Sequence, residues 1–280
     1  MPNPLAALWR THVTQVAERV NAESRAYLAA TPRAQADREA AVVLFTAIGG
    51  LIFINFFGRP GHLEVYRGVL EALHVGAWAD QLQSWLTAGF DGRFHQRLFW
   101  SVTRAIGYVG LPVLVIWGVL RGSVVDYGFR VQGILPHAKI YGAMLLAIAP
   151  AVIAASFTTP FQQTYPFYHL NPGEPLWPRL WLWELLYASQ FVALEFFFRG
   201  FLLHGLKRRL GYPAVWVMIV PYVMIHFDKP FAECLGAIVA GFVLGTLSLQ
   251  TGSMWWGAVI HTTVAWGMDL LSLGHQGRLG

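Results

Sequence analysis

The stretch WLWELLYASQFVALEFFFRGFLLHGL, residues 181–206, is long and apolar enough to cross a bilayer, yet it contains two opposite charges. A spanning helix needs about 20 predominantly apolar residues. Glu195 and Arg199 are four residues apart, with the acid first, so they lie on one helical face in the order that favours pairing. Charges at membrane depth are costly and mark a pair, a polar cavity or a reaction. The stretch predicts a membrane helix that holds an ion pair with either a structural or a chemical role.

Apolar runs of similar length recur along the whole chain, which is 55% hydrophobic and only 12% charged. Backbone groups in lipid must be paired within the segment, so helices are the expected spanning structure. We therefore predict an all-α polytopic bundle of about seven transmembrane helices, the fifth interrupted by Pro213 and Pro221. The predicted spans are 40–58, 99–120, 140–157, 181–206, 212–226, 231–249 and 253–273.

Two further segments have apolar residues on one helical face. In the first, Leu5, Trp9, Val13 and Val20 repeat at helical spacing, and residues 62–90 repeat the pattern. Such helices lie on a membrane surface or pack on the bundle. We expect residues 1–39 to form an amphipathic N-terminal segment and residues 40–280 to form the membrane-embedded domain. The first 35 residues do not have the compact apolar core of a cleavable signal.

The formal net charge of +5 does not indicate nucleic-acid binding, because the basic residues fall in short loops beside apolar spans. Arg121, Arg130 and Lys139 follow the second span, and residues 207–209 follow the fourth. With the N-terminus inside, both groups lie on the cytoplasmic side. Membrane lipid is thus the first expected partner. The one cysteine, Cys234, excludes an intrachain disulfide and a cysteine-based zinc site.

The last hundred residues add ionisable groups at membrane depth. His226 ends the fifth predicted span, and His261 lies near the middle of the last one. Asp269 follows His261 by about two turns, Glu233 begins the sixth span, and Glu184 precedes Glu195 by eleven residues. A carboxylate, an arginine and two imidazoles from three helices are suitable for activating water. A buried ion pair, packing histidines and a solvated loop at Glu233 would explain the same residues structurally.

These residues resemble the motifs of a known family, the CAAX protease and bacteriocin-processing (CPBP) intramembrane endopeptidases, which include type II CAAX prenyl endopeptidases and bacterial Abi proteins. The family pattern is EExxxR, then FxxxH, then HxxxN or a similar residue. This chain has LEFFFR at 194–199, YVMIH at 222–226 and HTTVA at 261–265. The resemblance covers residues 181–273 and implies an intramembrane protease with catalytic residues Glu195, Arg199, His226 and His261.

Three positions depart from the family pattern. Tyr222 replaces phenylalanine, which is a conservative change. Leu194 stands where the family has the glutamate taken to activate water, and Ala265 stands where a polar residue would help to stabilise the oxyanion. The resemblance then implies either that Glu195 is the general base, assisted by Glu233, Asp269 or Glu184, or that the scaffold is kept without activity.

In the active version, Arg199 keeps Glu195 ionised, His226 holds the water and His261 donates a hydrogen bond to the oxyanion. We favour a mechanism without a metal or other cofactor, because the chain has no HExxH spacing. If zinc were present, its ligands would be Glu195, His226 and His261.

The expected substrate is a peptide or membrane-associated protein, for example a prenylated CAAX peptide, a bacteriocin leader peptide or a C-terminal sorting tail, cut near its end. The expected location is the bacterial inner membrane. Two other classes remain open. An inactive CPBP-like binding or immunity protein would explain Leu194 and Ala265, whereas a transporter would be expected to show inverted repeats, and none is visible in the sequence.

Overall fold

The computed structural model describes residues 3–171 and 173–279, and its regular elements there are helices. The only β pairing in this part of the chain is an isolated bridge between Phe129 and Ser253. The long α-helices are α3 (Arg33–Phe57), α8 (Ala138–Ser156), α10 (Arg179–Glu195), α13 (Phe231–Thr251) and α14 (Trp255–His275). The shorter α-helices are α1 (Pro4–Trp9), α2 (Gln15–Ala30), α4 (Leu63–Ala72), α5 (Ala77–Leu86), α6 (Gly92–Ala105), α7 (Leu111–Gly118), α9 (Thr159–Thr164), α11 (Leu203–Leu210) and α12 (Ala214–Met224).

Several α-helices are joined without a break by π-helical turns, and 3₁₀ turns lie in the connectors. The π turns are η1 (Arg10–Thr14), η4 (Ile106–Gly110) and η7 (Phe196–Leu202). The 3₁₀ turns are η2 (Pro60–His62), η3 (Gly89–Asp91), η5 (Val124–Tyr127) and η6 (Leu135–His137). α10, η7 and α11 therefore form one continuous helix, Arg179–Leu210.

Five helices in the described residues are long and apolar enough to cross a membrane. They are Arg33–Phe57, Gly92–Gly118, Leu135–Ser156, Arg179–Leu210 and Phe231–Thr251. Large apolar side chains cover their outer surface: Phe45 on α3 is 73% exposed and Leu146 on α8 is 78% exposed. Water-soluble proteins rarely expose large contiguous apolar patches. The chain is an all-α, polytopic, integral membrane protein.

The two other predicted spans are also helical, but neither is among these five. α12 has only 11 residues and contains Pro221, with Pro213 at its N-cap, so the prolines shorten this segment as expected. α14 has 21 residues and carries the polar side chains His261 and Asp269 within its length. Both helices bring residues of interest to the centre of the bundle.

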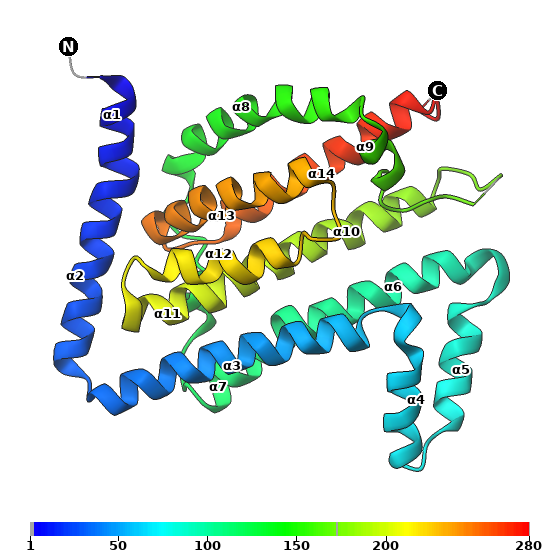
Figure 1. The fold of residues 1–280 in the computed structure, drawn as a ribbon, viewed down its shortest axis with the longest axis horizontal. Helices are drawn as coiled ribbons and strands as arrows, with labels where there is room; N and C mark the ends of the chain where they lie inside the picture. The colour runs from blue at the N-terminus through cyan, green and yellow to red at the C-terminus, as the bar shows by residue number, and fades with distance from the viewer. Residues whose placement is uncertain (1–2, 172, 280) are drawn as a thin grey trace.

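The long helices run side by side along the long axis of the molecule, and other helices lie across its two ends (Figure 1). α2 crosses the end at which α3 begins and packs on α11. α4 and α5 form a helical hairpin at the opposite end of α3. An ion pair of 2.8 Å between Arg67 and Asp80 joins the two helices of this hairpin. The two segments with amphipathic patterns thus lie at opposite ends of the bundle.

The continuous helix Arg179–Leu210 is the most buried of the five, because 67% of the residues in its most apolar stretch are buried inside the protein. The phenylalanines of η7 form the centre of the core: Phe196, Phe197, Phe198 and Phe201 are all at most 1% exposed. α14 and α6 pack along α10, and α3 and α2 pack along α11. The residues at the junction of α10 and η7 are therefore surrounded by protein on every side.

Close packing of α12 on α13 depends on two glycines. A Cβ on Gly241 would lie 2.9 Å from Cγ1 of Ile219, and one on Gly245 would lie 2.9 Å from Cε of Met218. Small residues at such positions let helix backbones approach closely. This contact fixes α12 beside η7 and sets the position of Tyr222, which is 1% exposed.

Candidate active site

Glu195 and Arg199 form an ion pair at the point where α10 passes into η7. Arg199 Nη1 lies 3.0 Å from Glu195 Oε1, and both side chains are fully buried. A buried charge without a partner is strongly destabilising, so each residue requires the other. The pair gives the buried carboxylate a counter-charge inside an apolar helix bundle.

His261 of α14 binds the same carboxylate oxygen. Its Nδ1 lies 3.1 Å from Glu195 Oε1. An ionised carboxylate only accepts hydrogen bonds, so Nδ1 of His261 carries a proton, and in the neutral imidazole Nε2 then keeps its lone pair. The ring packs 4.6 Å from that of Phe191, and the imidazole side chain remains 19% exposed. His261 is thus the polar group of this cluster with the most access to its surroundings.

Gly257, one turn before His261, permits this approach of α14 to α10. A Cβ at position 257 would lie 2.5 Å from Glu195 Oε2 and 3.1 Å from its Cδ. Any side chain there would displace the carboxylate. The contact of His261 with Glu195 therefore depends on a residue that carries no chemistry.

Tyr222 and His226 enter from the third helix, α12, and the turn that follows it. The Tyr222 ring lies 3.8 Å from Cζ of Arg199, 4.8 Å from the His226 ring and 6.5 Å from the His261 ring. His226 Nδ1 donates to the Tyr222 carbonyl at 2.7 Å, which again leaves Nε2 with its lone pair. The sequence indicated Tyr222 only as a replacement for phenylalanine. In the structure it lies between the arginine and both histidines.

Glu184 and Asp269 lie far along their helices from the Glu195 pair. Eleven residues correspond to a rise of roughly 16 Å between Glu184 and Glu195. Asp269 is fully buried, and it accepts hydrogen bonds from the Phe167 amide at 2.9 Å and from Trp183 Nε1 at 3.5 Å. Its carboxylate holds the connector before α10 against α14.

Glu233 belongs to another group of contacts, at the start of α13. It accepts a hydrogen bond from the Tyr165 hydroxyl at 2.7 Å and lies 3.9 Å from Lys229 Nζ. Throughout the described residues, Glu184, Asp269 and Glu233 make no hydrogen bond or ion pair with the four predicted catalytic residues. Assistance by these three carboxylates at Glu195 remains a prediction from sequence.

Two of the three positions that depart from the family pattern, Leu194 and Ala265, are packed as apolar residues. Leu194 is half-buried against the core around η7. Ala265 is 4% exposed and belongs to an aromatic cluster that includes Trp183, Tyr187 and Phe191. Neither position adds a polar group beside Glu195.

The arrangement of Glu195, His226 and His261 does not fit a zinc site. Nowhere in the described parts of the chain do three His, Cys, Asp or Glu side chains come together as a ligand set. Glu195 Oε1 is already bound by Arg199 and His261, and His261 uses Nδ1 for that contact. We therefore derive no step through a metal.

Comparison with known proteins identifies the region that contains this cluster. Residues 175–267 match the family model described as "Type II CAAX prenyl endopeptidase Rce1-like". Neither the curated proteins nor the solved structures contain a match to the chain. The matched region includes the Glu195–Arg199 pair together with Tyr222, His226 and His261, and excludes the N-terminal helices. Residues 175–267 of this membrane protein are a domain of the Rce1-like type II CAAX prenyl endopeptidase family.

Proposed function

We propose that the protein is an intramembrane endopeptidase that hydrolyses a peptide bond near the end of a membrane-associated protein or peptide. The observation that carries this proposal is the 3.1 Å contact of His261 Nδ1 with the buried carboxylate of Glu195. A carboxylate that orients an imidazole and stabilises its charged form is a recurrent means of activating a nucleophile. The match to a protease family supports a peptide bond as the target.

The geometry favours separate roles for Glu195 and His261 in the reaction. Glu195 is fully buried, whereas His261 is 19% exposed and has Nε2 unused. We therefore assign proton abstraction from water to His261 Nε2, with Glu195 holding the tautomer and stabilising the imidazolium. This differs from the sequence-based hypothesis, in which Glu195 itself is the base. His226 Nε2 accepts a second hydrogen bond from the same water.

The reaction then proceeds in two steps. The water oxygen bonds to the scissile carbonyl carbon while its proton passes to His261, and this gives a tetrahedral intermediate. The C–N bond breaks as the His261 imidazolium returns the proton to the departing nitrogen. Arg199 acts through Glu195, with which it forms an ion pair at 3.0 Å, and so it is a positioning residue.

Two buried atoms support the presence of a polar ligand or water at the pair. Glu195 Oε2 and Arg199 Nε have no hydrogen-bond partner among the described residues. Buried polar atoms in proteins are nearly always paired, with ordered water where the protein offers no partner. This supports access of water to the cluster.

The placement of the helices supports a specific topology. We propose seven crossings, formed by the five long helices with α12 and α14, and amphipathic helices on both membrane faces. The end with α2 and residues 207–209 is assigned to the cytoplasm by its basic side chains. A bacterial inner membrane and a substrate such as a leader peptide or a C-terminal sorting tail complete the proposal.

A second function is favoured by a specific observation, the apolar packing of Leu194 and Ala265. A CPBP-like domain without a carboxylate at position 194 would retain the scaffold and bind a membrane peptide without cutting it. An immunity or scaffolding protein would act in this way.

Cleavage of membrane-anchored fluorogenic peptides by the protein in nanodiscs tests both functions. Glu195→Gln and His261→Ala should each reduce the rate by about 10²–10⁴, as loss of general-base catalysis does. Asp228→Asn is the matched control, because this carboxylate is 77% exposed and pairs only with Arg59 in the described structure. Equal rates for Glu195→Gln and the control would disprove the role of the pair.

Leu194→Glu separates an enzyme from an inactive relative. In the proposed enzyme, a second carboxylate next to Glu195 adds a buried charge and should lower the rate or leave it unchanged. Cleavage that appears only in Leu194→Glu would show that the natural chain is inactive and that its binding function is the correct one.

A further inference from the structure

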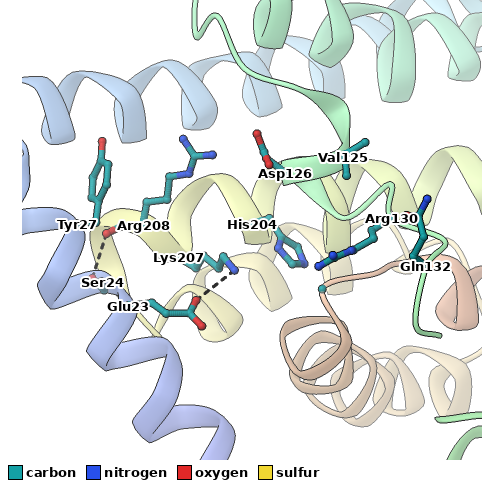
Figure 2. Close-up of a pocket in the computed structure, with 11 residues that line it drawn as sticks. Glu23, Ser24, Tyr27, Val125, Asp126, Arg130, Gln132, His204, Lys207 and Arg208 are labelled. Carbon is teal, nitrogen blue, oxygen red and sulfur yellow. Dashed lines mark hydrogen bonds and ion pairs between the residues drawn. The ribbon is translucent and has the colours of Figure 1, made fainter. Parts of the chain in front are cut away.

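A polar cavity of about 540 Å³ lies at the basic end of the bundle, away from the Glu195 cluster. Side chains from α2, from the connector after α7 and from α11 line it (Figure 2). Neither the sequence motifs nor the proposed proteolysis uses these residues. The cavity is of the size that small-molecule sites usually have.

The lining has more cationic than acidic side chains. Arg130, Lys207 and Arg208 are basic, and Glu23 and Asp126 are acidic. In the described residues, Arg130 and Arg208 have no carboxylate within the 4.0 Å of an ion pair, and Lys207 Nζ lies 3.5 Å from the half-exposed Glu23. Two of the three cations thus remain without a counter-charge of the protein.

The basic groups converge from separate elements. Figure 2 shows the Arg130 guanidinium pointing toward the His204 imidazole from one side, with the Lys207 ammonium on the other side of that imidazole. His204 is 2% exposed, and its Nε2 lies 3.1 Å from the Ser248 hydroxyl. That hydroxyl donates to the Arg199 carbonyl, so His204 Nε2 donates to it in turn and the imidazole is held in place. The floor of the cavity is therefore rigid and polar.

The position of the cavity indicates the source of its ligand. Lys207 and Arg208 lie in the last turn of a spanning helix, and α2 packs across the same end of the bundle. Lipid headgroups lie at this depth, and basic pockets between membrane helices on the cytoplasmic side bind phosphate-bearing headgroups. Arginine and lysine are the side chains that bind phosphate best in proteins.

We propose that this cavity binds the phosphate group of an anionic lipid headgroup, with Arg130 and Lys207 as its principal donors. Glu23 pairs with Lys207 when the phosphate is absent and is half exposed, so it can turn to solvent when the phosphate arrives. The proposal is independent of proteolysis, because it concerns different residues at one end of the bundle.

Native mass spectrometry of the full chain in detergent tests the proposal. The added probes are phosphatidylglycerol, diacylglycerol with the same acyl chains but no phosphate, and glycerol phosphate as the soluble form of the headgroup. We expect phosphatidylglycerol to bind at a defined stoichiometry and diacylglycerol to bind at least tenfold more weakly. The protein could instead bind glycerol phosphate and retain no lipid. If Arg130→Glu abolishes that binding, the result would support the same phosphate site with a soluble ligand.

Arg130→Glu is the decisive variant, since this exposed side chain makes no ion pair in the described structure and its replacement should not affect folding. Reversal of its charge should weaken phosphatidylglycerol binding by roughly tenfold or more, as expected for loss of a charge-assisted contact. Arg38→Glu is the matched control, because Arg38 lies near the same end of the bundle but does not line the cavity. Equal losses in the two variants, or equal binding of diacylglycerol, would overturn the proposal.

Discussion

Replacement of Gly257 by alanine should move the Glu195 carboxylate without touching any ionisable residue. The added Cβ would lie 2.5 Å from Glu195 Oε2. A normal carbon–oxygen contact is about 3.3 Å, so the oxygen has to move by roughly 0.8 Å. A surface glutamate would simply turn away. Glu195 cannot, because Arg199 and His261 bind its other oxygen at 3.0 and 3.1 Å.

The size of the effect follows from two opposing terms. Alanine is favoured over glycine inside a helix by about 1 kcal/mol. Overpacking of a tight site costs about 1–3 kcal/mol, and weakening the buried ion pair adds to that cost. We expect a net loss near 2 kcal/mol, which lowers the thermal midpoint by roughly 4–8 °C for a chain of this size. If Glu195 orients His261, peptide cleavage should fall by about 10²-fold, as a 1 Å displacement does.

Gly267→Ala is the control for this experiment, because Gly267 is in the same helix and has no atom within 4 Å of its added Cβ. Thermal unfolding of both variants in one detergent gives a result even if no substrate is found. Gly267→Ala should match or exceed the natural protein. Gly257→Ala unfolding at the same temperature as Gly267→Ala would refute the confinement of Glu195 against α14.

Two other predictions concern buried charges. Arg199→Met leaves the carboxylate of Glu195 buried without its cationic partner, so it should destabilise the protein by about 3–5 kcal/mol. Adding Glu195→Gln should recover part of that loss, measured by denaturant unfolding. Purely additive losses in the double variant would contradict the pairing. The second concerns Glu174, in the connector before α10. Burial acts to raise its pKa, but hydrogen bonds from the Asn171 amide and the Tyr168 hydroxyl outweigh this and hold the pKa below the ordinary value of 4.5. Stability from this carboxylate is therefore complete above pH 4.5 and is lost as the pH falls through the lower folded pKa. Glu174→Gln should abolish that part of the acid destabilisation, measured as the thermal midpoint against pH, and an unchanged pH profile would contradict it.

Hydropathy predicted the positions of the helices because an apolar segment of spanning length must pair its backbone polar groups within itself when it lies in lipid. Each of the seven predicted segments overlaps a helix of the structure, including the proline-interrupted segment that became α12. The all-α polytopic fold was thus predictable from residue order alone. The crossing of α2 over α11 was not, because an amphipathic pattern indicates a buried face without saying what buries it.

The candidate site, too, could be predicted from the sequence only in part. The contact of Glu195 with Arg199 follows from spacing within one helix, so sequence suffices for it. Sequence also gives the spacing of Asp269 from His261, about two turns along one helix, but it does not give the tertiary neighbours of each turn. In the structure Asp269 binds the Phe167 amide. The place of Tyr222 in the candidate site could not be predicted, because its contact with Arg199 exists only once α12 packs on α13.

The π-helical turn η7 has a consequence for how the chain tolerates change in length. A π turn holds one more residue than an α turn, and such turns are common at functional sites. Each residue of an α-helix advances the side-chain direction by about 100°. Because η7 already holds an extra residue, removing one residue between 196 and 202 would let this turn become ordinary α-helix, and the helix after it would keep nearly its present direction relative to Glu195. The contacts of His204 with Ser248 and of Lys207 with Glu23 would then survive the deletion. The same deletion within α10 would instead rotate everything after it by that angle. η7 is thus the turn at which this helix can lose a residue without changing the angle between its two halves.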